Sequence, residues 1–436
     1  MKSIWSDTAA LPSFETLNED ISTDVLIIGG GIAGILCAYM LDKAGVNYTL
    51  VEASTICSGI SKNTTAKITS QHGLIFHKMV KRFGIENAHL YIEANETALH
   101  EYAKLCQSID CGFEWKDSYV YALDDPKKLE KEMDALNQIG YPADFVTELP
   151  LPFTTAGAVC FPEQAQFHPL QFLAHIAKDL HIYEHTMVKE LSDNLAFTDH
   201  CKIRADKMIV TTHFPLLRWR GSYFLKMYQD RSYVIALENA PNVDGMFVDE
   251  AEKGMSFRNY QDLLFIGGGD HRTGKKGGNW AELQEFAKKY YPNAREVARW
   301  APQDCMTLDD FPYIGQYAPS TPNLYAATGF NKWGMTSSMV AATMLRDMIL
   351  GKNNPYTELF SPSRSILRPQ LLVNGFEAVT NLLTPTLKRC PHMGCALKWN
   401  PQEHSWDCPC HGSRFEEDGK LIDSPAAHDI KKFDLN

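Results

Sequence analysis

The sequence predicts an α/β protein with several domains, and two observations lead to this fold class. Near the N-terminus, an apolar strand at residues 24–28 runs into a glycine-rich turn and then into a helix whose apolar residues recur every 3.6 positions. Near the C-terminus, two short boxes of cysteine and histidine, CPHMGC and CPCHGS, are separated by twelve residues. With 436 residues, the chain is long enough for two or three domains with substantial cores.

The N-terminal turn has the features of a dinucleotide site. Gly29 lets the strand turn, Gly31 lets the backbone approach a pyrophosphate, and Gly34 allows close packing of the helix. Glu52 ends the next predicted strand, where its carboxylate can bind both hydroxyls of a ribose. The order of strand, helix, second strand and acid predicts a Rossmann-like dinucleotide-binding domain rather than a tight turn alone.

Two further segments bear on the choice between FAD and NAD. Residues 59–67 form a small polar run that can lay backbone amides and hydroxyls on a pyrophosphate. Far downstream, a predicted strand leads into an apolar helix whose N-terminus can face a flavin carbonyl. The candidate cofactor residues in these segments are Ser61, Thr64, Thr65, Ala66, Gly329, Gly334 and Thr336.

This combination resembles the D-amino-acid oxidase and glycine oxidase family of flavoenzymes over about residues 22–350. The resemblance implies FAD, held by a Rossmann-like domain with an inserted β-rich substrate domain. It also implies that the Val188 backbone contacts adenine and that a strand returns to the flavin domain near Thr212. By position, Arg258 is expected to hold a substrate carboxylate, and an ordinary surface or ion-paired arginine is the alternative.

The C-terminal boxes supply cysteine and histidine at CxH and CxxH spacing, with two further cysteines left over. Thiolates and neutral imidazoles in this combination suit a [2Fe-2S] cluster of the Rieske type. A structural zinc site is the alternative, because two cysteines and two histidines also suit tetrahedral zinc. The second cysteine pair and the HGS sequence favour the cluster.

The two boxes resemble those of the Rieske proteins of cytochrome bc complexes. The resemblance implies one iron bound by two cysteines, a second iron bound by two histidines, and a disulfide that ties the two cluster loops together. These residues are, in the same order, Cys390 and Cys408, His392 and His411, and Cys395 and Cys410. Full Rieske domains have several strands before the first box, and this chain has room for few. We therefore expect a small, truncated all-β domain.

One position departs from the cytochrome bc pattern. In those proteins the serine of HGS and a tyrosine two positions later both donate hydrogen bonds toward sulfur, which raises the reduction potential. Here Ser413 is present, but Phe415 has no hydroxyl. We expect a potential in the lower or middle part of the Rieske range of ~−150 to +300 mV.

The motifs described above set the boundaries of the expected domains. The FAD-binding domain comprises residues 22–86, 155–214 and 300–352, and the substrate domain comprises residues 87–154 and 215–299. Residues 353–384 form a linker, in which residues 371–383 are expected to be one helix. The Rieske domain covers residues 385–436.

Composition and charge limit the partners and the location. A formal net charge of −11 argues against nucleic acid. No apolar run approaches ~18 residues, and the N-terminal segment has acids where a signal peptide would be apolar. We expect a cytoplasmic protein without a membrane anchor, with a small-molecule substrate and an unidentified electron acceptor. The oligomeric state stays open, a homo-oligomer included.

The sequence thus predicts an FAD-dependent oxidoreductase that oxidises an amine or amino acid and passes electrons singly to a Rieske cluster. One alternative is a cluster-based redox sensor or partner-docking protein with a vestigial flavin site, which would show no substrate-dependent flavin bleaching. Another is a plain oxidase whose C-terminal module is only structural. Oxygen consumption with and without residues 385–436 would identify the plain oxidase. The sequence does not name the substrate.

Overall fold

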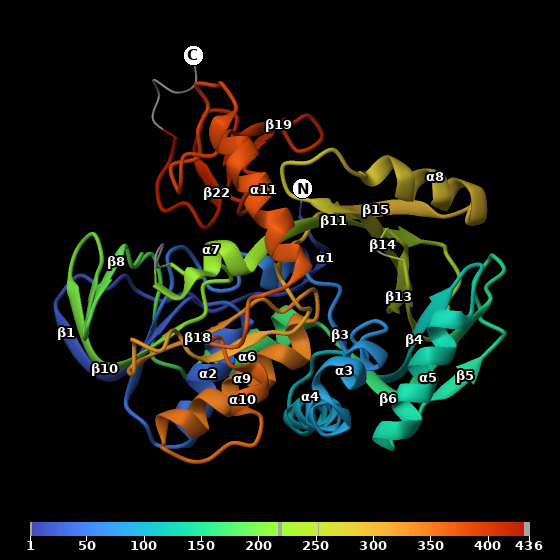
Figure 1. The fold of residues 1–436 in the computed structure, drawn as a ribbon, viewed down its shortest axis with the longest axis horizontal. Helices are drawn as coiled ribbons and strands as arrows, with labels where there is room; N and C mark the ends of the chain where they lie inside the picture. The colour runs from blue at the N-terminus through green and yellow to red at the C-terminus, as the bar shows by residue number, and fades with distance from the viewer. Residues whose placement is uncertain (1, 217–219, 252, 431–436) are drawn as a thin grey trace.

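A computed structural model describes residues 2–216, 220–251 and 253–430. Two large sheets make up the body of the molecule, and a small third sheet near the C-terminus sits on top of them (Figure 1). The first large sheet contains parallel strands with helices packed on it, and the small sheet is antiparallel. The predicted fold class, α/β with a small all-β C-terminal module, is confirmed.

The first sheet carries the glycine-rich turn. Its central strand β1 (Ile21–Ile28) pairs in parallel with β2 (Tyr48–Val51) on one side and with β10 (Lys202–Val210) on the other. The last four residues of β1 are buried, as expected for a strand covered on both faces. The other strands of this sheet are β7 (Ile182–Tyr183), β8 (Glu190–Ser192), β9 (Leu195–Phe197), β17 (Tyr313–Gln316) and β18 (Leu324–Thr328).

The second sheet is built mainly from antiparallel pairs. Its long strands are β11 (Met227–Glu238), β14 (Leu263–Arg272), β4 (Glu114–Ala122) and β6 (Gly157–Gln166). The shorter strands are β3 (Lys67–Ile68), β5 (Asp144–Val146), β12 (Met246–Asp249), β13 (Ser256–Tyr260), β15 (Arg295–Trp300) and β16 (Gln303–Thr307). Strands β3, β6 and β16 pair in this sheet, although the boundaries expected from the sequence place them in the FAD-binding domain.

Helices cover both sheets. On the first sheet, α2 (Ile32–Lys43) follows the glycine turn and packs against α9 (Gly334–Ile349). On the second sheet, α8 (Trp280–Tyr290) packs against β11 and β14. The other helices of the body are α1 (Ile4–Thr8), α3 (Phe76–Phe83), α4 (Ile85–Cys106), α5 (Lys127–Ile139), α6 (Pro169–Ala177), α7 (Tyr223–Lys226) and α10 (Thr357–Phe360), with short 3-10 turns at Ile60–Lys62 and Arg220–Ser222.

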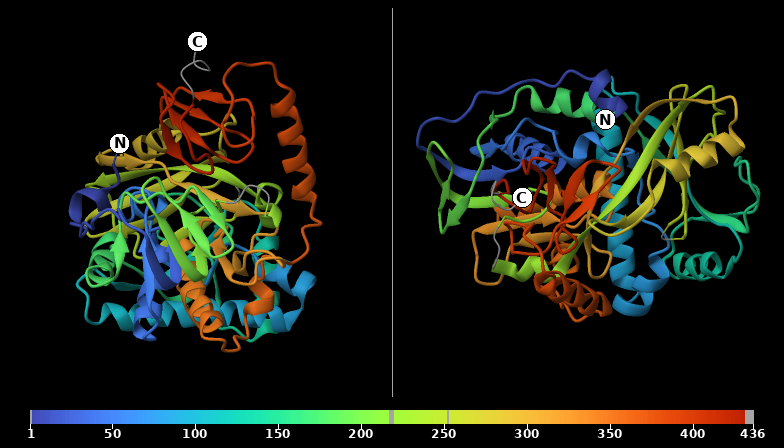
Figure 2. Two further views of the ribbon diagram at one scale, coloured as in Figure 1. Left: turned by 90° about the vertical axis from the view of Figure 1, so that its left-hand side faces the viewer. Right: turned by 90° about the horizontal axis from the view of Figure 1, so that it is seen from above.

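The C-terminal part begins with one helix on the outside of the molecule. Helix α11 (Pro369–Leu383) runs from the body toward the small sheet, as the left view of Figure 2 shows. The small sheet has the order β19 (Lys398–Asn400), β20 (Ser405–Asp407), β21 (Arg414–Glu416) and β22 (Leu421–Asp423). Among the described residues, none of the helices has the length and apolar character needed to cross a membrane.

Candidate functional site: a cofactor cavity beside a cysteine and histidine cluster

The turn between β1 and α2 leaves a small space in front of the α2 N-terminus because three of its residues are glycines without side chains. Gly29 has φ +112°, a value that residues with a Cβ rarely adopt. A Cβ on Gly34 would come within 1.9 Å of the Gly29 carbonyl oxygen, so only glycine lets α2 pack this closely. A Cβ on Gly31 would lie 3.2 Å from Ser61 Oγ, in front of the helix N-terminus. The backbone amides of the helix N-terminus therefore stay accessible to an anionic ligand.

Two polar side chains hold this turn in place. Glu52, directly after β2, accepts the Gly30 N–H through Oε2 at 2.7 Å and the Ser54 N–H through Oε1 at 2.9 Å. Ser61 Oγ accepts the Ile32 N–H at 2.9 Å. The Glu52 carboxylate thus stands beside the turn at the end of its strand, where a ribose-binding acid is expected.

Most of the predicted cofactor residues line one cavity of about 1400 Å³. Single ligand pockets usually measure ~300–1,000 Å³, so this cavity has room for a dinucleotide and a substrate together. The lining includes Gly29, Gly31, Glu52, Ser61, Thr64, Thr65, Val188, Thr212, Gly329 and Gly334. The glycine turn, the acid after β2 and the cavity size all fit FAD.

Three predicted cofactor residues support the cavity wall without lining it. Gly34 lies at the contact between α2 and the turn. Ala66 donates its N–H to Thr64 Oγ1 at 2.9 Å. Thr336, in the first turn of α9, donates its hydroxyl to the Thr69 carbonyl oxygen at 3.1 Å. The residues of this helix that face the cavity are Gly334 and Met335.

Arg258 lies outside the cavity lining, contrary to the expectation that it holds a substrate carboxylate. It is fully buried, and its Nη1 donates to the carbonyl oxygens of Thr65 and Ala66 at 2.6 and 2.8 Å. The rings of Trp5, Tyr260 and Phe265 surround its guanidinium. Arg258, on β13, thus contacts the backbone of residues 65 and 66 on the side away from the cavity and stabilises the loop that lines the cavity.

Lys67 ends the polar run of residues 59–67 and lines the cavity, although it was not among the candidate cofactor residues. It lies at the start of β3. Burial, reinforced by the nearby positive charge of Arg258, lowers the pKa of the Lys67 ammonium to about 7. Its signal in the sequence was its place in that polar run, which was expected to contact the cofactor through backbone amides and hydroxyls.

A second group of charged residues lines the cavity from β11, β14, β16 and the loop before α9. Lys332 forms an ion pair with Asp270, and its Nζ lies 4.0 Å from Asp230 Oδ2. Burial raises the pKa of the nearby Asp304 carboxyl to about 6. These residues do not form a motif in the sequence, because they are far apart in the chain. It makes one side of the cavity rich in carboxylates.

The four predicted cluster ligands come together at one end of the small sheet. Cys390 and His392 precede β19, whereas Cys408 and His411 lie between β20 and β21. All four are buried, and the two histidine ring centroids are 4.9 Å apart. The hydrogen bond between Cys390 and Cys408 lowers the pKa of the Cys390 thiol and raises that of the Cys408 thiol, and the Ser413 hydroxyl lowers the pKa of Cys390 further. Such a lowered pKa favours the thiolate that a metal requires.

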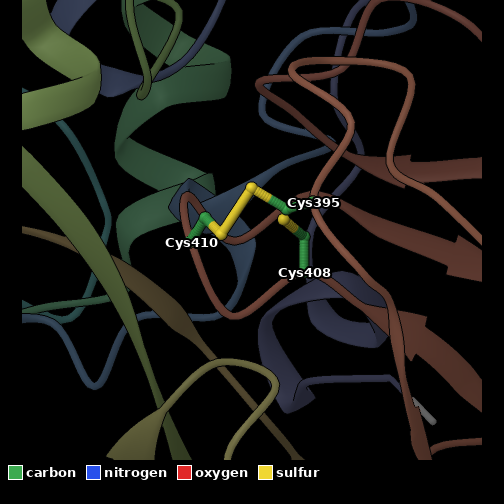
Figure 3. A group of neighbouring side chains, drawn as sticks. All are labelled: Cys395, Cys408 and Cys410. Atoms are coloured by element: carbon green, nitrogen blue, oxygen red, sulfur yellow. A yellow bond between two sulfur atoms is a disulfide. The ribbon is translucent and has the colours of Figure 1, made fainter. Parts of the chain in front are cut away.

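The two remaining box cysteines are paired. Cys395 and Cys410 form a disulfide in the structure, with a separation of 15 residues in sequence. Figure 3 shows this bond beside Cys408, whose sulfur lies within 4.8 Å of both of the others. The pair joins the first cluster loop to the second.

His411 is oriented as a metal ligand would be. Its Nε2 lies 3.1 Å from the Phe224 carbonyl oxygen, on α7 of the body. Its Nδ1 is buried and has no hydrogen-bond partner among the residues that the structure describes. Burial lowers the pKa of His411 to about 3, so its ring is neutral and Nδ1 is available as a ligand atom. The donor set and this orphaned nitrogen fit a [2Fe-2S] cluster.

The cofactor cavity and the cluster ligands are neighbours. Phe214 lines the cavity, and its ring centroid lies 6.2 Å from the rings of both His392 and His411. Gln303, also in the cavity lining, donates through Nε2 to the Gly412 carbonyl oxygen at 2.9 Å. Residues 421–427 of the C-terminal module form part of the cavity wall.

Charged residues fasten the C-terminal module to the body. Arg231, on β11, is buried and forms an ion pair with Glu403, with Nε 3.1 Å from Oε1. Within the module, Arg414 holds the same Glu403 at 2.9 Å and Asp407 at 3.0 Å. Arg272 donates to the Pro409 carbonyl oxygen at 2.9 Å. The second cluster box is therefore held directly by strands of the body.

Two family models match the chain. One, described as FAD dependent oxidoreductase, matches residues 24–348, and the other, described as Rieske [2Fe-2S] domain, matches residues 379–434. A Bacillus subtilis protein named as a Rieske 2Fe-2S iron-sulfur protein, YhfW, is 34% identical over 99% of this chain and 97% of its own length. The cytochrome b6-f complex iron-sulfur subunit 3 of a Nostoc species is 45% identical over 10% of this chain and 24% of its own length.

Solved structures resemble the body of the molecule. Glycine oxidase from Geobacillus kaustophilus has a TM-score of 0.67 and 19% sequence identity, and the match covers 79% of this chain and 99% of that chain. At this identity the likeness concerns the fold. It agrees with the resemblance stated from the sequence motifs.

Proposed function

Because the chain belongs to the family of FAD-dependent oxidoreductases and carries a C-terminal Rieske [2Fe-2S] domain, we propose that it oxidises an amine or amino acid and transfers the electrons internally to its cluster. Its cofactors are FAD and a [2Fe-2S] cluster. When bound, FAD supplies a two-electron acceptor for the substrate, and the cluster supplies a one-electron carrier.

The proposal assigns roles to residues of this chain. Gly31 and the N-terminus of α2 receive the pyrophosphate, and Glu52 receives the ribose hydroxyls. The four buried residues Cys390, His392, Cys408 and His411 ligate the cluster, and the Cys395–Cys410 disulfide ties the loops that carry them. Residues 421–427 and Gln303 close the cavity on the side of the cluster, which limits the entry of water.

The observation that carries the proposal is the position of Phe214. Its ring contacts the rings of both cluster histidines and also lines the cavity. The cluster ligands therefore border the cavity that would hold FAD, and direct electron transfer between the two cofactors is part of the proposal. A cluster with a purely structural role would not need to lie against the cofactor cavity.

The substrate class rests on the family and on the charges of the cavity. On the wall formed by β11, β14, β16 and the loop before α9, Asp230, Asp270 and Asp304 lie near Lys332, so carboxylates outnumber ammonium groups on this wall. Arg231, also in the lining, is paired with Glu403. This side of the cavity suits a substrate with an amino group. The electron acceptor is unidentified, and a cytoplasmic location stays a prediction.

An anaerobic substrate screen tests the proposal. D- and L-amino acids and simple amines are added to the purified protein, flavin absorbance is followed, and frozen samples are examined by EPR. We expect one class of substrate to bleach the flavin and to produce the signal of a reduced Rieske cluster. In Cys408→Ser, bleaching should persist and the signal should disappear, whereas His404→Gln, in the loop between the boxes, should behave as wild type.

The same screen identifies the alternatives. Bleached flavin with a cluster that stays oxidised through many turnovers would support a plain oxidase with a structural C-terminal module. Absence of bleaching with every substrate, in protein that holds both cofactors, would support a redox sensor. A C-terminal module that contains zinc and no iron would contradict the cluster itself.

A further inference from the structure

Helix α11 exposes its apolar side to solvent and turns its polar side to the protein. The described part of the chain contains sixteen large hydrophobic side chains that are exposed, and eight of them fall between residues 367 and 387. Their exposed fractions run from 43 to 78%. These residues are Leu367, Leu372, Val373, Phe376, Val379, Leu382, Leu383 and Leu387. Contiguous apolar surface of this extent marks an interaction site.

The opposite side of α11 is already occupied by polar contacts. Asn374 accepts from Arg272 Nη1 at 2.8 Å and donates to the Leu225 carbonyl oxygen at 3.3 Å. Glu377 forms an ion pair of 2.6 Å with Lys275. The Asn381 carbonyl oxygen accepts the Ala396 N–H at 2.9 Å. These contacts fix the rotation of the helix, so the apolar side cannot turn inward.

The exposed stripe has the spacing of a coiled-coil seam. Leu372, Phe376, Val379 and Leu383 follow one another at intervals of four, three and four residues, which is the alternation of core positions in a heptad. Such a stripe packs best against a second helix with the same spacing. A second copy of this chain supplies that helix, because an isologous interface uses the same patch on both partners.

We propose that two copies of this protein associate through α11, with the two helices antiparallel about a two-fold axis. The axis passes between Glu377 and Ala378, so Leu372 packs against Leu383 of the other copy, and Phe376 packs against its Val379. Burying eight large side chains per copy removes an area on the order of the ~800 Å² that each partner contributes to a standard interface.

The charges around the stripe favour a protein partner over a membrane surface. A helix that lies in a membrane interface carries a polar face rich in lysine and arginine. Here the only charged residue of α11 is Glu377. Of the flanking cations, Arg364 is paired with Asp309 and Lys388 lies over the Trp406 ring. Arg368 donates to the Leu367 carbonyl oxygen, and Arg389 donates to the carbonyl oxygens of Leu382, Thr384 and Gly394. The net charge of −11 further opposes binding to an anionic bilayer.

Analytical ultracentrifugation of the holoprotein tests the association. Wild type should sediment at about twice its mass of 49.1 kDa. Phe376→Lys places a lysine from each copy beside the two-fold axis and should raise the dissociation constant at least ~100-fold, because the charges would be buried without partners. Leu123→Lys, at an exposed leucine on the body, is the matched control and should stay dimeric. FAD content should be the same in all three.

A cysteine pairing experiment tests the antiparallel geometry. Under oxidation, a mixture of Leu372→Cys and Leu383→Cys proteins should give a covalent dimer, and neither variant alone should. Residues 372 of the two copies would be ~16 Å apart along the helices, beyond the reach of a disulfide. Crosslinking within either single variant would overturn the antiparallel arrangement. A wild-type protein that is monomeric in solution would overturn the proposal. Binding of that monomer to phosphatidylglycerol vesicles would show that the apolar stripe contacts a membrane instead.

Discussion

A single buried arginine supports the segment that lines the cofactor cavity. Arg258 donates two hydrogen bonds to the carbonyl oxygens of Thr65 and Ala66, and aromatic rings surround the rest of its guanidinium. These contacts join β13 of the second sheet to the loop that faces the cofactor. The residue therefore acts on cofactor binding through the position of that loop.

Replacement of this arginine should weaken FAD binding. In Arg258→Met the two carbonyl oxygens lose their donor, and we expect the free energy of unfolding to fall by about 2 kcal/mol. FAD affinity should fall as well, whereas KM for the substrate should stay unchanged in protein saturated with FAD. Urea unfolding, FAD titration and steady-state kinetics measure these quantities. A raised KM at normal stability and normal FAD affinity would restore the role in substrate binding that the sequence indicated.

Lys67 should make the stability of the apoprotein depend on pH. Burial, with the charge of Arg258, lowers its pKa from 10.5 to about 7 in the folded state. Below pH 7 the Lys67 amine is protonated in both the folded and the unfolded state, and the desolvated ammonium lowers the stability of the folded state. Between pH 7 and 10.5 only the unfolded state keeps the proton, so stability rises with pH.

The substitution Lys67→Met removes this titration. We expect the apoprotein variant to be more stable than wild type by about 2 kcal/mol at pH 6 and to show a smaller rise toward pH 10. Urea unfolding at several pH values measures both effects. Lys104→Met, at an exposed lysine, is the control. An identical pH profile in wild type and Lys67→Met would contradict the cavity-facing position of Lys67.

Two glycines of the first turn should differ sharply when replaced. Gly31 has φ −78°, which any residue adopts, so Gly31→Asp should leave the fold intact and abolish FAD binding by placing a carboxylate before the α2 N-terminus. In Gly34→Ala the new Cβ would clash with the Gly29 carbonyl oxygen, and the body should lose at least ~3 kcal/mol of stability. Circular dichroism and flavin absorbance separate the two outcomes. A yellow Gly31→Asp protein would count against the assignment of the turn.

At the scale of the elements, the cluster loops depend on two glycines and one hydroxyl. Gly394 and Gly412 have φ +78° and +87°, so each loop turns where only glycine is unstrained. Ser413, just after the second loop, hydrogen-bonds toward Cys390 and accepts the Ala426 N–H at 3.0 Å. Phe415 is fully buried in the small core beside the cysteines.

These contacts lead to a prediction for the reduction potential. Ser413→Ala should lower the potential, because the hydroxyl stabilises the more negative reduced state. Phe415→Tyr should raise it if the new hydroxyl reaches sulfur, and the wild-type value should lie in the lower or middle part of the ~−150 to +300 mV range. EPR-monitored redox titration measures all three. A wild-type potential near the top of that range, or two unshifted variants, would refute this account.

At the scale of the whole molecule, docking of the C-terminal module places the two cofactor sites together. Arg231→Leu breaks the buried ion pair between β11 and Glu403, so that Glu403 keeps only its ion pair with Arg414 of its own module. We expect electron transfer from reduced flavin to the cluster to slow at least ~10-fold, with both reduction potentials unchanged. Stopped-flow absorbance measures the rate. Arg299→Leu, at a more exposed pair, is the control, and an unchanged rate in Arg231→Leu would show that docking does not depend on this contact.

The sequence by itself determined the parts whose chemistry is local. The turn at Gly29, Gly31 and Gly34 and the two cysteine and histidine boxes each lie within a few residues, so their spacing already fixes which atoms can meet. The helix expected at residues 371–383 is contained in α11 for the same reason, since its apolar residues follow a regular interval. FAD, the cluster and the overall fold class follow from these segments.

Only the tertiary structure decided which segments meet. It placed Arg258 behind the cavity, set Phe214 against both cluster histidines, gathered Asp230, Asp270 and Asp304 on one wall, and turned the apolar side of α11 outward. Each of these results depends on contacts between residues far apart in the chain. Local periodicity shows that a helix has an apolar side, but the hydrogen bonds and ion pairs of distant segments fix the direction in which that side faces.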